Sequence, residues 1–157
     1  MQPKAEPLEV GIRPISEADR EAYTQLLQRL PPEDRRFRFF HAIREYSEAY
    51  IEPFVHLDPG TVGLVAEANG EMIGAGHAFS GPDGVFELGV VVDSKWRRHG
   101  VAGRLVERLL AALRTRGARA LTATSLVENT EFTKMALEHR LELTGTIEAV
   151  NQWRLDL

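Results

Sequence analysis

The sequence contains no cysteine, which excludes disulfides, thiolate metal ligands and cysteine nucleophiles. It has no apolar run long enough to span a bilayer, and polar residues 1–9 lack the apolar core of a signal peptide. It also has no basic excess: the formal net charge is -4 at pH 7, unlike that of a typical nucleic-acid-binding protein. These absences lead us to expect a cytoplasmic protein that binds neither membranes nor nucleic acid.

What remains is the composition of an ordinary globular domain. The chain has 157 residues, of which 43% are hydrophobic and 27% charged. A chain of this size buries about 70% of its unfolded surface in one domain. We find no repeat, low-complexity tract or linker, so we predict a single domain over residues 1–157 with residues 1–9 as a flexible tail. The five histidines show no metal-ligand spacing, so we expect no metal.

Hydrophobic periodicity and turn residues predict alternating strands and helices. Strands are expected over residues 10–15, 61–68, 71–79, 86–92, 120–125, 141–147 and 150–157. Helices are expected over residues 17–30, 32–40, 48–57, 99–116 and 129–139. This order predicts a mixed sheet covered by helices, which is a three-layer α/β fold.

The most informative stretch joins the valine-rich strand ending at Val92 to the helix that follows. Residues 97–103 combine basic side chains with Gly100, Ala102 and Gly103, which leave the backbone open to a ligand. The first N–H groups of a helix lack intrahelical partners and lie at the positive end of its dipole. The junction therefore predicts an anion site, for which phosphate is the usual ligand. It matches neither a Walker A loop nor a three-glycine dinucleotide motif.

The series Arg97-x-x-Gly100-x-Ala102 resembles the acyl-CoA pyrophosphate loop of the GNAT superfamily of N-acetyltransferases, Arg/Gln-x-x-Gly-x-Gly/Ala after an apolar strand. The order of elements is also the GNAT order, so the resemblance covers nearly the whole chain. Ile12-Arg13-Pro14-Ile15 with Asp19, residues 30–40 and the series Glu87-x-x-Val-Val-Val-x-x-x-Trp-Arg-x-x-Gly are similar to bacterial Pat-type protein lysine acetyltransferases. The implied fold is a GNAT-like α/β/α sandwich with a splayed central sheet.

The resemblance implies acetyl-CoA as cosubstrate. The backbone of Val90, Val91 and Val92 would hold the pantetheine amides and polarise the thioester carbonyl, although these residues also fit a plain core strand. The helix start would wrap the pyrophosphate, although any one arginine there also fits a solvated surface. The residues assigned to this role are Arg97, Arg98, His99, Gly100, Val101, Ala102, Gly103 and Arg104.

Asn129 matches the asparagine that opens the second CoA-contacting helix of GNAT relatives, where it reaches the pantetheine arm. It is equally suited to capping the helix that begins at Thr130. The two roles are compatible.

Glu87 interrupts an apolar strand just before the loop. Its pattern alone suggests an outward-facing charge, but the resemblance to Pat-type enzymes places the general base at this position. Partial burial would suit its carboxylate to deprotonating an ammonium, directly or through water. We therefore expect Glu87 to be the catalytic base.

The chain departs from the GNAT pattern after Asn129. Many relatives carry a tyrosine six or seven residues later as general acid for the thiolate, where this chain has Met135 and Ala136. Ser125 is a weak alternative donor. The thiolate is also able to take its proton from water or from the outgoing amine.

The resemblance thus implies an N-acetyltransferase acting on a primary amine, with a protein lysine ε-amine as the favoured acceptor. Two alternatives stay open: an acetyltransferase for small amines, which would need a deep acidic pocket, and a non-catalytic acyl-CoA sensor. A homodimer is compatible with the sequence. Helix residues 35–40 offer a substrate-facing wall, although Phe37 and Phe40 also fit the core.

Overall fold

The computed structural model describes residues 9–39 and 46–157. The predicted tail, of which residues 1–8 are not described, and the predicted helix end at Phe40 lie outside these ranges.

A seven-stranded sheet runs through the molecule in the order β1-β2-β3-β4-β5-β7-β6. Neighbouring strands are antiparallel except β4 and β5, which are parallel. The strands are β1 (Gly11–Pro14), β2 (Val62–Ala68), β3 (Glu71–Ser80), β4 (Val85–Val92), β5 (Ala120–Leu126), β6 (Glu142–Ile147) and β7 (Val150–Asp156). The predicted mixed sheet is confirmed, with strand ends within two residues of expectation.

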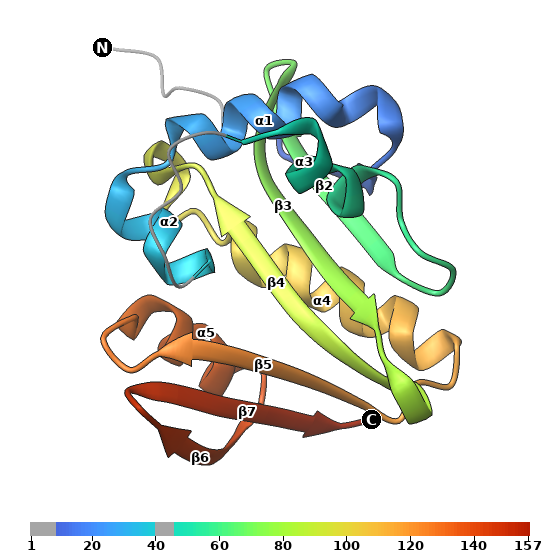
Figure 1. The fold of residues 1–157 in the computed structure, drawn as a ribbon, viewed down its shortest axis with the longest axis vertical. Coiled ribbons are helices and arrows are strands. Elements are labelled where there is room, and N and C mark those ends of the chain that lie inside the picture. Colours follow the sequence, from blue (N-terminus) through green and yellow to red (C-terminus); the bar gives the residue numbers. More distant parts are fainter. Residues whose placement is uncertain (1–8, 40–45) are drawn as a thin grey trace, which may run out of the picture.

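Helices cover both faces of this sheet. They are α1 (Arg20–Arg29), α2 (Pro32–Phe39), α3 (Glu48–Val55), α4 (Val101–Thr115) and α5 (Thr130–Glu138). On one face, Leu105 and Leu109 of α4 and Met135 of α5 join the buried side chains of the sheet in one core. On the other face, Leu26 of α1 and Ile51 of α3 belong to a second core. Figure 1 shows α4 crossing behind the strands, so the predicted three layers are confirmed.

Turn residues place the strands in register. Asn69 and Gly70, the predicted hairpin turn, both have positive φ (54° and 73°), as a type I′ turn requires. Gly74 allows α4 to approach the sheet, because a Cβ there would lie 3.2 Å from Cγ1 of Val101. The predicted close packing at this glycine is confirmed.

The sheet splays between β4 and β5. Their parallel pairing ends at Glu87, which lies opposite Thr122. Beyond that point β4 continues along β3 as far as Val92, and β5 continues along β7 as far as Leu126. The two strands therefore separate and leave a wedge, visible in Figure 1 as the gap toward which α2 and α5 converge.

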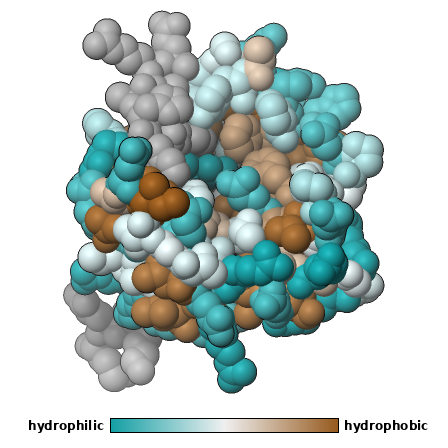
Figure 2. Space-filling model, turned by 60° about the horizontal axis from the view of Figure 1, so that its bottom comes forward, coloured by the Kyte–Doolittle hydropathy of each residue, from teal (hydrophilic) through white to brown (hydrophobic). Residues whose placement is uncertain are grey.

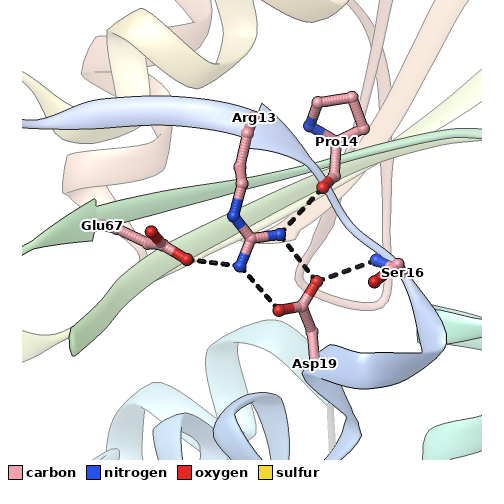
Figure 3. Close-up of polar contacts among 5 residues, drawn as sticks. All are labelled: Arg13, Pro14, Ser16, Asp19 and Glu67. Carbon is pink, nitrogen blue, oxygen red and sulfur yellow. Dashed lines mark hydrogen bonds and ion pairs between the residues drawn. The ribbon is translucent and has the colours of Figure 1, made fainter. Parts of the chain in front are cut away.

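An ion cluster ties the first strand to the first helix (Figure 3). Arg13 donates from Nη1 and Nη2 to the two oxygens of Asp19, at 2.9 and 2.7 Å, and also pairs with Glu67. The Ser16 N–H donates to Asp19 Oδ2 at 2.8 Å, the contact predicted for a capping box. The Arg13 guanidinium holds the pKa of the buried Asp19 carboxyl below its usual range. The cluster thereby joins β1, the start of α1 and β2.

The surface of the described part is mostly polar. On the face shown in Figure 2, apolar residues are dispersed among hydrophilic ones. The exposed large apolar residues are Val127, Leu137, Leu143 and Ile147. Among residues 9–39 and 46–157, no helix combines the length and the apolar character needed to cross a membrane.

Candidate active site

The wedge between β4 and β5 contains a pocket of about 390 Å³. Its walls come from β4, α2, the start of α4, β5 and the first turns of α5. The lining residues are Leu30, Asp34, Phe37, Arg38, Glu87, Leu88, Gly89, Val90, Val91, Val92, Arg97, Ala102, Thr124, Asn129, Glu131, Phe132 and Met135. The pocket thus brings together residues from both halves of the chain, including seven predicted from the sequence.

Glu87 lines this pocket at the point where the two strands part. In the described part of the chain, its carboxylate makes no hydrogen bond or ion pair, so a substrate or water can reach it. The residue is exposed. The partial burial expected from the sequence is therefore wrong, because β5 and α5 stand away from β4 beyond this residue. Its accessibility to the pocket is compatible with the predicted role as base.

The backbone of Val90, Val91 and Val92 forms one wall of the pocket. These residues pair with β3 on one side, and the parallel pairing with β5 has already ended. In an antiparallel ladder, alternate residues direct their N–H and C=O groups away from the partner strand. Some of these backbone groups therefore face the wedge, which is the arrangement expected for binding the amides of an extended ligand.

The loop before α4 has the geometry of an anion site. Arg98 and Gly100 both have positive φ (63° and 75°), which turns the chain tightly into the helix. The Arg104 N–H bonds to the Gly100 carbonyl at 3.1 Å, so the N–H groups preceding it lie at the open end of the helix. A Cβ built at Gly100 would meet no atom within 4 Å, which leaves space for a ligand. The cradle therefore fits the pyrophosphate of CoA.

Arg97 is the arginine of this loop that lines the pocket. Its guanidinium pairs with Asp34 of α2, and its Nε lies 3.8 Å from Oε2 of Glu131 in α5. Sequence reasoning missed both carboxylates. Asp34 lies in an acidic first helical turn and Glu131 follows a cap, and both patterns are common on solvent-exposed helices.

Other residues of the predicted loop do not line the pocket. Arg104 donates from Nη1 to the Val10 carbonyl at 3.0 Å, and His99 Nδ1 lies 2.8 Å from the Arg97 carbonyl oxygen. Val101 is buried in the core beneath α4. The members outside the lining are Arg98, His99, Gly100, Val101, Gly103 and Arg104. Their contacts with CoA stay predictions.

Asn129 both caps α5 and lines the pocket. Its Oδ1 accepts a hydrogen bond from the Phe132 N–H at 3.1 Å, and the residue also faces the wedge. The capping role is confirmed, and a contact with pantetheine stays a prediction.

The place of the missing tyrosine is taken by an apolar side chain, since Met135 lines the pocket. Ser125 is buried and accepts a hydrogen bond from Nε1 of Trp153 at 2.9 Å. The pocket is lined instead by its neighbour Thr124. The structure therefore gives no support to Ser125 as a proton donor.

A second feature missed from the sequence is the contact of Arg38 with Gly89. Both residues line the pocket, and a Cβ at Gly89 would lie 2.7 Å from Cζ of Arg38. The guanidinium also lies over the ring of Phe54, 5.7 Å from its centroid. The predicted substrate-facing wall of the second helix is thus observed at Phe37 and Arg38.

His77 is buried beneath this contact. Burial lowers its pKa to about 4, against the opposing effect of its hydrogen bond to the Phe54 carbonyl (2.8 Å). The imidazole is therefore neutral at physiological pH and donates from Nε2 to that carbonyl.

A separate group of potential metal ligands comprises Glu17, Glu52 and His56. They come from different elements, so sequence spacing could not reveal them. Glu52 is also paired with Arg20, and none of the three lines the pocket. The groups are exposed or half-buried, and their mutual contacts are accounted for by hydrogen bonds to the imidazole.

Comparison with known proteins identifies the family of this fold and site. The model of the acetyltransferase (GNAT) family matches residues 20–138, which include every wall of the pocket. Acetyltransferase PA5475 of Pseudomonas aeruginosa is 31% identical over 127 residues, covering 76% of this chain and 68% of that protein.

Solved structures agree. The GNAT domain of S. lividans PAT has a TM-score of 0.87 at 25% identity, covering 93% of this chain and 89% of that one. The PaiA N-acetyltransferase from Thermoplasma acidophilum, solved with coenzyme A, has a TM-score of 0.71 at 13% identity, covering 95% and 99%. Its similarity concerns the fold. The chain belongs to the GNAT family and is an acyl-CoA-dependent N-acetyltransferase.

Proposed function

We propose that this enzyme transfers an acetyl group from acetyl-CoA to the ε-amine of a protein lysine, by direct attack and with Glu87 as general base. The observation that carries the proposal is the position of Glu87. Its carboxylate, which has no hydrogen bond or ion pair within the described residues, opens onto the pocket where β4 leaves β5.

The cosubstrate is held along β4. The N–H and C=O groups of residues 90–92 that face the wedge bind the pantetheine amides, and one N–H polarises the thioester carbonyl. The open end of α4 and Arg97 bind the pyrophosphate. This arrangement places the thioester near Glu87 and the phosphates near the loop.

In the reaction, Glu87 accepts a proton from the acceptor ammonium, directly or through one water. The free amine attacks the thioester carbonyl carbon and forms a C–N bond, and the carbonyl becomes an oxyanion held by the β4 backbone. The intermediate then collapses, the C–S bond breaks, and CoA leaves as a thiolate. Met135 provides no proton, so the thiolate is protonated by water or by the outgoing amide nitrogen.

The protein lysine acceptor is supported by similarity to the PAT GNAT domain and by the balance of charge in the pocket. The carboxylates of Asp34, Glu87 and Glu131 are accompanied by the guanidinium groups of Arg38 and Arg97. A polyamine would favour a site of mainly negative charge. The three carboxylates keep a small cationic amine as a second candidate.

The test is the release of CoA from acetyl-CoA in the presence of lysine-containing proteins and peptides, polyamines and amino acids. Glu87→Gln should lower kcat at neutral pH by about 10²–10⁴-fold while leaving CoA affinity unchanged. The deficit should shrink as the pH approaches ~10.4, where lysine loses its proton without a base. The matched control is Glu142→Gln, an exposed glutamate on β6.

Two results would count against the proposal. Unchanged turnover by Glu87→Gln would remove Glu87 as base. Turnover confined to small amines would replace the protein acceptor with the second candidate.

A further inference from the structure

We infer that the acceptor subsite is a cation site lined by aromatic rings, and that Arg38 of α2 occupies it in the ligand-free enzyme. Its ligand class is a primary ammonium or guanidinium on a flexible aliphatic stem. The inference rests on the proposed function, because it identifies what the same pocket binds on its acceptor side.

The location follows from strand register. Glu87, Gly89 and Val91 alternate along β4 and therefore point to one face of the sheet. Val91 belongs to the core formed with α1 and α3, which identifies that face. Glu87 and Gly89 thus lie on the side of the sheet covered by α3.

Aromatic rings gather at this place. Gly89 pairs with His77 and Glu87 pairs with Phe79 on β3. The ring of Phe54 from α3 lies 5.4 Å from that of His77 and 5.7 Å from that of Phe79. These rings form an apolar floor beside the base.

The guanidinium of Arg38 lies on this floor. It is 5.7 Å from the centroid of Phe54, within the range of a cation–π interaction. It also takes the space of a side chain at position 89, since a Cβ on Gly89 would lie 2.7 Å from Cζ and 3.1 Å from Nε. Gly89 is therefore the residue that makes room for a cationic group at the sheet.

The charge around this place also favours a single cation. The imidazole of His77 is buried and neutral and adds no positive charge. Glu87 lies two residues along the same face, about 7 Å away along the strand. An ammonium in the position of the guanidinium would consequently lie beside both the base and the β4 backbone that holds the thioester.

The same helix reaches the other half of the pocket. Asp34 of α2 pairs with Arg97, the arginine expected to bind pyrophosphate. Thus α2 places a carboxylate where the cosubstrate's anion binds and a guanidinium where the acceptor's cation binds. Each ligand would replace a side chain of its own charge, which explains why one short helix lines both ends of the pocket.

The experiment removes the internal occupant and supplies a free one. Arg38→Ala should bind n-propylguanidine at least about tenfold more tightly than the wild-type enzyme, as measured by NMR titration of the ligand-free proteins. The KM for the acceptor amine should fall about fivefold or more, while kcat changes little. Arg38→Met, which keeps an apolar stem, serves as the second variant if Arg38→Ala unfolds.

The matched control is Arg36→Ala on the same helix. Arg36 pairs with exposed Glu128 at 2.5 Å and does not line the pocket, so this variant should bind propylguanidine like the wild type. Equal binding by all variants would overturn the inference. A fall in kcat at constant KM in Arg38→Ala would also overturn it, because it would make Arg38 part of the reaction.

Failure of the proposed function gives a different result. The titration needs neither acetyl-CoA nor turnover. Propylguanidine binding to Arg38→Ala without acetylation of any amine would reject the proposed function and keep the cation site. Acetylation of lysine without propylguanidine binding would reject the cation site alone.

Discussion

Neutralising Asp34 should tighten the binding of CoA. In the ligand-free enzyme its carboxylate pairs with Arg97, and the two side chains are 13% and 37% exposed. A pyrophosphate that enters the cradle must compete for this guanidinium and also approaches the carboxylate of Asp34. Asp34→Asn removes both costs and keeps the size of the side chain.

The expected gain is modest, because Arg97 is partly solvated. Ion pairs at exposed sites contribute about 0–1 kcal/mol, and solvent screening keeps this pair near that range. Relief of repulsion with the pyrophosphate adds a term of about the same size. The sum of about 1–2 kcal/mol corresponds to a five- to thirtyfold lower Kd.

Calorimetric titration with CoA at low and high salt measures this effect. The gain should shrink with salt, because screening weakens both terms. Pantetheine, which lacks the pyrophosphate, should bind both proteins equally. Glu33→Gln, an exposed neighbour outside the pocket lining, is the control. Weaker CoA binding by Asp34→Asn would refute the reasoning, since it would mean that Asp34 orients Arg97 for the bound cosubstrate.

Three further predictions concern the loop and the cores. Gly100→Glu should abolish CoA binding in calorimetry through charge and bulk in the open cradle, while Gly100→Ala should cost about 1 kcal/mol of stability because φ is 75°; binding retained by Gly100→Glu would reject the loop assignment. The free energy of unfolding should fall by about 3 kcal/mol between pH 6.5 and 4, because His77 gains a proton in the unfolded chain but not in the fold, and His77→Phe should remove most of this slope; equal slopes in urea titrations would contradict the burial argument. Arg13→Met should destabilise the fold by about 2 kcal/mol at neutral pH by leaving the Asp19 carboxylate buried, and by less as the pH falls and Asp19 is protonated; a loss independent of pH would show that packing, and not charge, makes the contribution.

The parts of the site that sequence reasoning located are those built from neighbouring residues. The path from Glu87 through Val92 to Gly100 is continuous, and its chemistry depends on a strand end, a tight turn and a helix start. Each of these has a local pattern: an apolar run, small residues and an amphipathic repeat. The splay was anticipated through the family resemblance, and the end of β4–β5 pairing at Glu87 confirms it.

The parts that escaped are contacts between distant segments. Asp34 and Arg38 belong to a short helix with alternating charges, which reads as a solvated surface. Nothing local indicates that α2 docks over the wedge, because docking depends on the space that β4 and β5 leave between them. Gly89 gave the only trace, as a glycine within a valine-rich strand, and that trace has several explanations.

The exposure of Glu87 changes where the strength of the base must come from. A buried carboxylate is desolvated by the fold, whereas this one, with no hydrogen bond or ion pair in the described structure, is open to water. Desolvation then has to come from the ligands: acetyl-CoA filling the wedge along β4 and an aliphatic acceptor stem covering the aromatic floor. An acceptor with a short or strongly polar stem would leave water at Glu87 and should react with a lower kcat, not only a higher KM. Comparing n-butylamine with ethanolamine at saturation tests this, and equal kcat values would show that acceptor binding does not desolvate the base.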